Sequence, residues 1–211
     1  MTGVQTCALP ICFPVTIGGA GFPMISSFLG NFNGDNKKLI GLYINKPTTD
    51  KVALFNKEAV SGYTGATVRN LIVEDSIIIG QNIVGTITAY TYQFNIDNCH
   101  VINGIVTGVG NVGGISGQWI RGYDIKDSSY NGVVKATGNN CGGIAGSIDN
   151  ASYEATRINN CEVEVTINST GGNIGGICGW CEGDILGIEL EEGDVVINAR
   201  PYRDWETEVV S

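Results

Sequence analysis

The sequence predicts an all-β protein folded as a parallel β-helix, or β-solenoid, with one coil for every ~29–33 residues. Three observations predict this fold. Glycine accounts for 31 of 211 residues, about twice its usual share. Short β-branched runs such as Cys161-Glu-Val-Glu-Val-Thr-Ile167 alternate in polarity between glycine-rich turns, without helical periodicity. A motif also recurs at a nearly constant interval, as in repeat proteins.

The first marker of the repeat is an asparagine followed by a glycine at a fixed distance. The members are Asn82, Asn111, Asn140 and Asn173, followed by Gly85, Gly114, Gly143 and Gly176. The first two intervals between the asparagines are equal, and the last is slightly longer. Stacked asparagines can hydrogen-bond along a column, and glycine supplies the positive φ and close packing that a corner needs. The marker therefore predicts one corner per coil. Inside it we expect an apolar column of Ile83, Val112, Cys141 and Ile174.

A second marker precedes the first by a little under half a period and recurs with it. Its members are Asn70, Asn98, Asp127 and Asn160, and the last of their intervals is again the longest. Two markers with one period indicate a true repeat and a second stacked corner. A β-propeller with one blade per repeat is the alternative, but such repeats usually need ~40–45 residues.

Four regions follow from these patterns. Residues 2–11, TGVQTCALPI, resemble a translated sequencing adapter, so we interpret residues 1–12 as an artefact. Residues 13–66 are expected to form an N-terminal lead-in coil, and residues 67–200 the repeats. The tail, residues 201–211, breaks the pattern and is a candidate artefact as well. We therefore expect the chain to be an internal piece of a longer protein.

Composition and charge narrow the classes of function. The net charge is −9, which argues against a nucleic-acid surface. No apolar run reaches the ~20 residues that span a bilayer as a helix. With a single histidine, His100, the chain offers little for a histidine-rich metal site or a Ser-His-Asp triad. We expect no cofactor.

The glycine-rich cores resemble the GLUG motif, a short repeat of large bacterial surface proteins, including the N-terminal regions of some immunoglobulin A peptidases. The cores are Val112-Gly-Gly-Ile-Ser-Gly117, Cys141-Gly-Gly-Ile-Ala-Gly146 and Ile174-Gly-Gly-Ile-Cys-Gly179. The resemblance covers roughly residues 28–180. The first repeat departs from it by keeping only the middle glycine of three. The resemblance implies a secreted or wall-attached β-helix module and no catalytic residues.

The sharpest local motif is Cys178-Gly-Trp-Cys181. A redox CxxC pair usually begins a helix, whereas this one lies within a repeat, where Cys178 aligns with Ser116 and Ala145. Core packing is the favoured interpretation. A local disulfide and a metal or redox site remain alternatives.

Exposed aromatic rings would provide the binding surface of such a protein. Tyr90, Tyr92 and Phe94 alternate along one predicted strand, and rings also recur further on. The candidate ligand face comprises Tyr90, Tyr92, Trp119 and Tyr123, with glycans or host or neighbouring surface proteins as expected partners.

Three functions are consistent with these features. The first is a non-catalytic extracellular stalk or adhesin segment at the cell surface or secreted. The second is a carbohydrate-active β-helix enzyme, a lyase or hydrolase, which would need paired carboxylates. Asp124, Lys126 and Asp127 form the only compact charged set, and Asp127 also belongs to a repeat column. The third is an accessory module of a secreted peptidase. We therefore predict no catalytic and no metal-binding residues.

Overall fold

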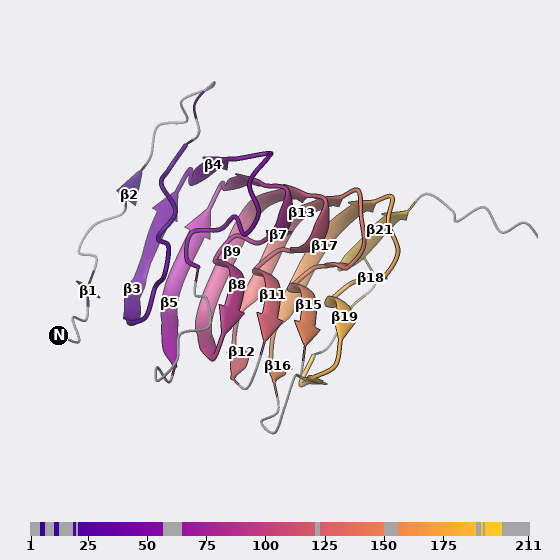
Figure 1. Ribbon diagram of the computed structural model, residues 1–211. Helices are drawn as coiled ribbons and strands as arrows, with labels where there is room; N and C mark the ends of the chain where they lie inside the picture. The colour runs from indigo at the N-terminus through magenta and orange to yellow at the C-terminus, as the bar shows by residue number, and fades with distance from the viewer. Residues whose placement is uncertain are drawn as a thin grey trace, which may run out of the picture.

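The protein is described by a computed structural model, shown in Figure 1, that covers residues 5–6, 11–12, 19, 21–56, 65–120, 123–149, 156–188, 191 and 193–199. Every regular element within these ranges is a β-strand. All pairing between the named strands is parallel. The predicted all-β parallel solenoid is therefore confirmed. Among the described residues, no helix is long and apolar enough to cross a membrane.

Three sheets form the walls of the solenoid. Sheet A has 13 strands: β1 (Gln5–Thr6), β2 (Ile11–Cys12), β3 (Asn31–Ile40), β4 (Tyr43–Asn45), β5 (Ala66–Glu74), β6 (Ile77–Ile79), β9 (Phe94–Gly108), β12 (Asp124–Lys126), β13 (Ser129–Ala136), β16 (Arg157–Asn159), β17 (Glu162–Ser169), β20 (Asp184–Leu186) and β21 (Val195–Ala199). Sheet B has four: β8 (Thr88–Tyr92), β11 (Ser116–Ile120), β15 (Ala145–Asp149) and β19 (Cys178–Cys181). Sheet C has four: β7 (Asn82–Val84), β10 (Gly110–Gly113), β14 (Cys141–Gly142) and β18 (Ile174–Gly175).

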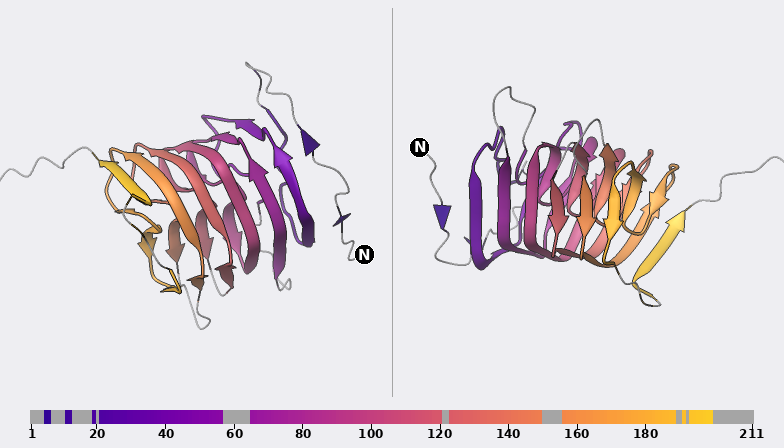
Figure 2. Two further views of the ribbon diagram at one scale, coloured as in Figure 1. Left: turned by 180° about the vertical axis from the view of Figure 1, so that it is seen from behind. Right: turned by 90° about the horizontal axis from the view of Figure 1, so that it is seen from below.

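Each repeat makes one coil that visits the three sheets in turn. The chain runs through β12 and β13 in sheet A, then β14 in sheet C and β15 in sheet B. It then returns to sheet A at β16, which pairs with β12. Figures 1 and 2 show the coils stacked side by side from the indigo to the yellow end. The tail, residues 201–211, lies outside the described residues.

The core fills the inside of the tube with columns of apolar side chains. Alternation along each strand sends every second side chain inward, and parallel register places equivalent residues over one another. Ile96, Ile125 and Ile158 form one column, and Val106, Val134 and Ile167 another. All six side chains are fully buried. Each contributes roughly 1.5–3 kcal/mol through burial.

One corner of the coil is a column of residues in the left-handed backbone conformation. Its φ values are 57° at Lys51, 59° at Ile83, 49° at Asn111, 64° at Asn140 and 52° at Asn173. Asn140 Nδ2 donates to Asn111 Oδ1 at 2.7 Å, and Asn173 Nδ2 donates to Asn140 Oδ1 at 2.8 Å. Asparagine tolerates this conformation better than most residues. The last three coils therefore carry the predicted asparagine ladder.

The alignment expected for the first repeat is wrong by one residue. Val84 pairs with Val112, so the residue above Asn111 is Ile83 rather than Asn82. Val84, not Ile83, continues the apolar column, and Gly85 matches Gly113 rather than Gly114. The first repeat therefore keeps the first glycine of the three, and not the middle one. Asn82 instead donates through Nδ2 to Asp50 Oδ1 at 3.0 Å.

The central glycines of the motif provide space, not positive φ. The backbone at Gly114, Gly143 and Gly176 is not in the positive-φ region. A Cβ on Gly114 would lie 2.2 Å from the Gly143 carbonyl oxygen and 2.4 Å from the Tyr130 ring. A Cβ on Gly143 would lie 2.1 Å from the Gly176 carbonyl oxygen. The expectation of a positive φ at these positions is therefore wrong. Glycine is needed there because neighbouring coils approach too closely for any side chain.

The second marker forms a second left-handed corner, as predicted. The φ values are 53° at Asn70, 51° at Asn98, 51° at Asp127 and 50° at Asn160. Asn98 Nδ2 donates to Asn70 Oδ1 at 2.8 Å, and Asn160 Nδ2 donates to Asp127 Oδ1 at 2.7 Å. Gly187, with a φ of 61°, occupies the same corner one coil later. This column therefore continues to the last coil.

Replacing Ile83 with asparagine should stabilise the protein. A β-branched residue at a φ of 59° is strained, and the left-handed conformation costs a non-glycine residue roughly 1–2 kcal/mol. Asparagine tolerates this conformation and extends the ladder by one rung above Asn111. We expect Ile83→Asn to raise the free energy of unfolding by about 1 kcal/mol, measured by urea denaturation. Ile83→Gly separates the two effects, since it relieves the strain without adding a rung. A variant no more stable than the parent would contradict this account.

Candidate functional site

The outer face of sheet B carries two of the four predicted ligand residues. Tyr90 and Tyr92 lie on β8 with their side chains half-exposed, because the alternating residues Ala89 and Thr91 point inward. In the neighbouring strand β11, Gln118 stacks beside Tyr90 and Ile120 beside Tyr92. The outer face of sheet B therefore places two phenol rings next to polar and apolar side chains.

Polar groups around the rings are already oriented by contacts between coils. Gln118 Nε2 donates to Asp149 Oδ2 at 2.5 Å. Lys51 Nζ lies 4.5 Å from the centre of the Tyr90 ring, a cation–π distance. Trp180, 47% exposed, lies in the same column as Tyr90 and Gln118 but three coils from Tyr90. At the ~4.8 Å spacing of strands, Tyr90 and Trp180 are roughly 14 Å apart.

The assignment of Trp119 to the ligand face is wrong. Its side chain is fully buried, since it points inward between Gln118 and Ile120. The indole Nε1 donates to the Tyr123 carbonyl oxygen at 3.1 Å, and the ring meets Phe94 edge-on at 6.0 Å between centroids. The structural register agrees, because Trp119 aligns with Thr91 and Ile148, which are both buried.

Phe94 and Tyr123 also lie away from the outer face of sheet B. Gln93 has a φ of 52°, and this corner turns Phe94 into the core. The alternation of Tyr90, Tyr92 and Phe94 therefore stops at the corner. Tyr123 is half-buried directly before β12 in sheet A, and its hydroxyl lies near Gly65. Of the four residues predicted for the ligand face, the structure therefore brings together only Tyr90 and Tyr92.

The compact charged set makes contacts between coils. Asp124 pairs with Arg157 Nε at 3.4 Å, and Lys126 Nζ pairs with Asp97 at 3.3 Å. Asp127 occupies a left-handed corner and accepts a hydrogen bond from Asn160. The lone histidine, His100, contacts Ser129 Oγ at 2.9 Å and Asn98 Oδ1 at 3.0 Å. All of these contacts except the one between His100 and Asn98 join successive coils along sheet A.

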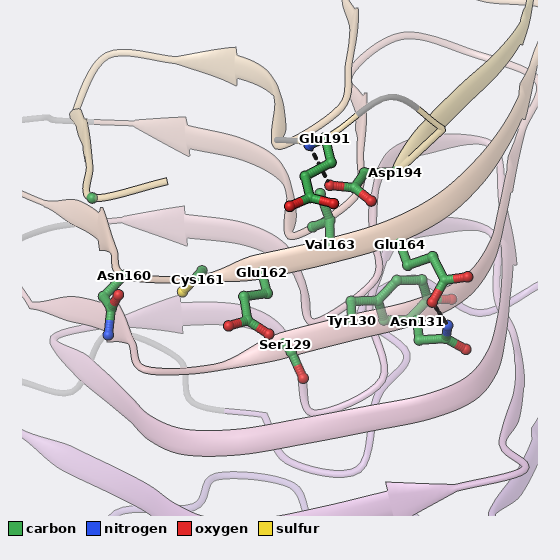
Figure 3. A pocket seen from close by; sticks show the side chains of 11 residues that line it. Ser129, Tyr130, Asn131, Asn160, Cys161, Glu162, Val163, Glu164, Glu191 and Asp194 are labelled. Carbon is green, nitrogen blue, oxygen red and sulfur yellow. Dashed lines mark hydrogen bonds between the residues drawn. The ribbon is translucent and has the colours of Figure 1, made fainter. Parts of the chain in front are cut away.

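An open depression of about 740 Å³ lies beside β17 near the last coil. Figure 3 shows its lining, which comes from β13, the corner before β17, the start of β17 and the loop before β21. Asn131 Nδ2 donates to Glu164 Oε2 at 2.5 Å, and the Glu191 backbone N–H donates to Asp194 Oδ2 at 2.6 Å. Among the described residues, no three His, Cys, Asp or Glu side chains group closely enough to hold a metal ion. Tyr130 contributes no reactive hydroxyl here, because burial raises its pKa and the hydroxyl donates to Gly104 O at 2.9 Å.

The five cysteines whose side chains the structure describes fall into two classes. Cys99, Cys141 and Cys161 are buried free thiols, and burial raises the pKa of Cys99 and Cys141 to about 12 and that of Cys161 to about 11. Cys178 and Cys181 lie on β19 in the last described coil, where Cys181 is exposed. Cys178 continues the Ser116 and Ala145 column, as expected. Cys181 departs from the expected core packing, because no strand described here covers it.

The two thiols of the CxxC pair have opposite shifts in pKa. The hydrogen bond between the two thiols raises the pKa of Cys178, and burial raises it further. The same hydrogen bond lowers the pKa of Cys181 to about 6, against a smaller opposing effect of burial. Cys181 is therefore the more readily ionised thiol of the pair.

Alkylation should distinguish these thiols. With limiting iodoacetamide at pH 7 we expect Cys181 to be modified first, because the thiolate is the nucleophile. Its rate should rise through pH 6 and level off above it, while Cys99, Cys141 and Cys161 stay unmodified in the folded protein. Peptide mass mapping over pH 4–9 measures this. Equal labelling of Cys99, Cys141, Cys161, Cys178 and Cys181 at pH 7 would contradict the assignment.

Together, the stacked coils and their asparagine corners define this chain as a β-solenoid of structural repeats. Comparison with known proteins finds a similarity to Halomucin from Haloquadratum walsbyi, with 29% identity over 143 residues. The aligned region covers 65% of this chain but 2% of Halomucin. No family model and no solved structure matches the chain.

Proposed function

We propose that this chain is a non-catalytic, extracellular β-solenoid segment of a larger surface protein, and that it binds glycans through the outer face of sheet B. Support for a structural role comes from the ionisable and amide side chains, many of which join one coil to the next. The similarity to Halomucin, a mucin by name, and the GLUG-like repeat support a surface location. The aligned region covers only 2% of Halomucin. That this chain is part of a larger protein is therefore itself part of the proposal.

The half-exposed pair Tyr90 and Tyr92 carries the glycan proposal. Aromatic rings pack against the apolar faces of sugar rings, while amides and carboxylates bond to sugar hydroxyls. Gln118 and Asp149 supply both polar groups on the adjacent strands β11 and β15, held together by their own hydrogen bond. Because they sit on rigid strands, these four side chains need little ordering on binding, which favours affinity.

A glycan array screened with the folded chain tests this function, with far-UV circular dichroism as the folding control. We expect binding to a restricted set of glycans and at least a tenfold loss in Tyr90→Ala or Tyr92→Ala. Tyr43→Ala is the matched control, since Tyr43 is also half-buried but lies on β4 of sheet A. A folded chain that binds no glycan would leave the structural role alone. Equal losses in all three variants would contradict the placement of the site.

A further inference from the structure

The outer face of sheet B carries a column of side chains that runs along the solenoid axis, across the strands. Figure 1 shows β8, β11, β15 and β19 side by side. Their register places Gln118 beside Tyr90, Ser147 beside Gln118 and Trp180 beside Ser147. We call these four residues the axial column. Because residues in register on parallel strands share a face, the axial column presents an aromatic ring at each end and two polar side chains between them.

Trp180 points outward because of this register, and not because it lies in the last described coil. Its side chain is 47% exposed. A further coil would stack on the edge of β19, in the way that β11 stacks on β8. Tyr90 stays half-exposed beside Gln118, so a neighbouring coil does not cover this face. The Trp180 ring is therefore accessible from the side of the solenoid, whatever follows it along the axis.

The hydroxyl of Ser147 lacks a hydrogen-bond partner. Its oxygen is buried, and Ser147 as a whole is 1% exposed. A buried hydroxyl without a partner is destabilising, so such groups call for an explanation. Ser147 lies between Gln118 and Trp180 in the axial column. A ligand hydroxyl at this position supplies the missing partner when the exposed Trp180 side chain turns aside.

The charges beside the axial column favour an uncharged ligand. The Lys51 ammonium lies against the ring of Tyr90, at one end of the column. The Asp149 carboxylate lies on β15, next to the strand that carries Trp180. A sugar chain of uniform charge therefore meets a like charge at one of these two places. The net charge of −9 opposes an acidic chain further.

The distance between the two rings suits an extended sugar chain. Polysaccharides of β-1,4-linked pyranose rings are ribbon-like, and each sugar advances by about one strand spacing, ~4.8 Å. Tyr90 and Trp180 are three strands apart, or roughly 14 Å. The two rings therefore match sugars three positions apart in one chain, where aromatic rings pack against apolar ring faces. Gln118 and Ser147 match the hydroxyls of the sugars between them.

We propose that the axial column binds an uncharged, extended β-1,4-linked polysaccharide, and that the sugar chain runs along the solenoid axis with about one sugar for each coil. Trp180 and Ser147 thereby join Tyr90 and Gln118 as binding residues. This inference rests on the proposed glycan function and makes it specific in ligand class and direction. It predicts that affinity depends on the length of the sugar chain, because a short ligand contacts only one of the two rings.

Isothermal titration calorimetry of the full chain with cello-oligosaccharides and chito-oligosaccharides of two to six sugars tests the proposal. We expect the affinity for at least one series to rise at least tenfold from the disaccharide to the tetrasaccharide, because about four sugars span both rings. It should change little beyond that length. Oligomannuronate, which is also β-1,4-linked but acidic, should not bind. The length dependence is measured on the unmodified chain, so it does not depend on the folding of a variant.

Trp180→Ala tests the far end of the axial column. We expect it to lower the affinity for the hexasaccharide at least tenfold and to leave the weak binding of the disaccharide unchanged. Val109→Ala is the matched control: Val109 is 42% exposed but lies between β9 and β10, away from sheet B, so this variant should bind like the parent. Circular dichroism confirms the folding of both variants.

Failure of this inference is distinguishable from failure of the proposed function. A chain that binds other glycans on the array through Tyr90 and Tyr92, but neither β-1,4-linked series, keeps the proposed function and overturns the inference. Affinity that is independent of chain length, a preference for oligomannuronate, or equal losses in Trp180→Ala and Val109→Ala would each overturn it as well. A folded chain that binds no glycan at all overturns both.

Discussion

Gly114→Ala is expected to destabilise the protein by about 3 kcal/mol or more. The added methyl would lie 2.2 Å from the carbonyl oxygen of Gly143, and that oxygen belongs to the backbone of the next coil. It would also lie 2.4 Å from the Tyr130 ring, which is fully buried and cannot swing away. Relief therefore requires two coils to separate, which weakens the parallel pairing on either side. Chemical denaturation followed by circular dichroism measures the loss.

Gly110→Ala is the matched control for this prediction. A Cβ on Gly110 would have its nearest neighbours at 3.5 Å and 3.6 Å, which is ordinary van der Waals contact. Both glycines belong to the same repeat, and neither has a positive φ. We therefore expect Gly110→Ala to change the free energy of unfolding by no more than about 0.5 kcal/mol. If the two substitutions cost the same, close coil packing is not the reason for the regular recurrence of the central glycine.

Trp119→Ala should cost about 3–5 kcal/mol. The substitution empties the largest fully buried side-chain site described in the core and removes the indole hydrogen bond to the Tyr123 carbonyl. It also removes the edge-on contact with Phe94. Parallel strands on both sides hold the backbone of β11, so the cavity can collapse only in part. The change should appear as a lower midpoint in urea denaturation.

Trp180→Ala provides the comparison within the same sheet. Trp180 is 47% exposed on the edge strand β19, so its loss should cost less than about 1 kcal/mol. Similar losses in the two variants would mean that Trp119 does not occupy the core.

The repeat period and the strand alternation predicted the solenoid correctly. The column of Asn70, Asn98, Asp127 and Asn160 was identified from spacing alone, because each coil must return to the same corner after a nearly fixed length of chain. The first marker is misleading at one point. The interval from Asn82 to Asn111 equals the one from Asn111 to Asn140, but the coil that leads to Asn111 closes one residue sooner. Ile83 therefore takes the corner in place of Asn82.

Side-chain direction next to corners could not be predicted from local alternation. Phe94 continues the spacing of Tyr90 and Tyr92, yet the left-handed turn at Gln93 sends it inward. Trp119 is of a residue type common in ligand sites, and only its register with Thr91 and Ile148 shows that it faces the core. A residue in the left-handed conformation breaks the two-residue period, and the sequence does not mark every such residue.

The sequence alone determined the fold class, the coil length and the asparagine corners, because a period of apolar and turn-forming residues is a one-dimensional property of the chain. Only the tertiary structure decided which aromatic rings face solvent, why the central glycines are needed and where Cys181 lies. These features depend on distances between neighbouring coils that are far apart along the chain, such as the approach of Gly114 to Gly143. Close packing of neighbouring coils is decided by three-dimensional register, and a slip of a single position reverses the face of every side chain.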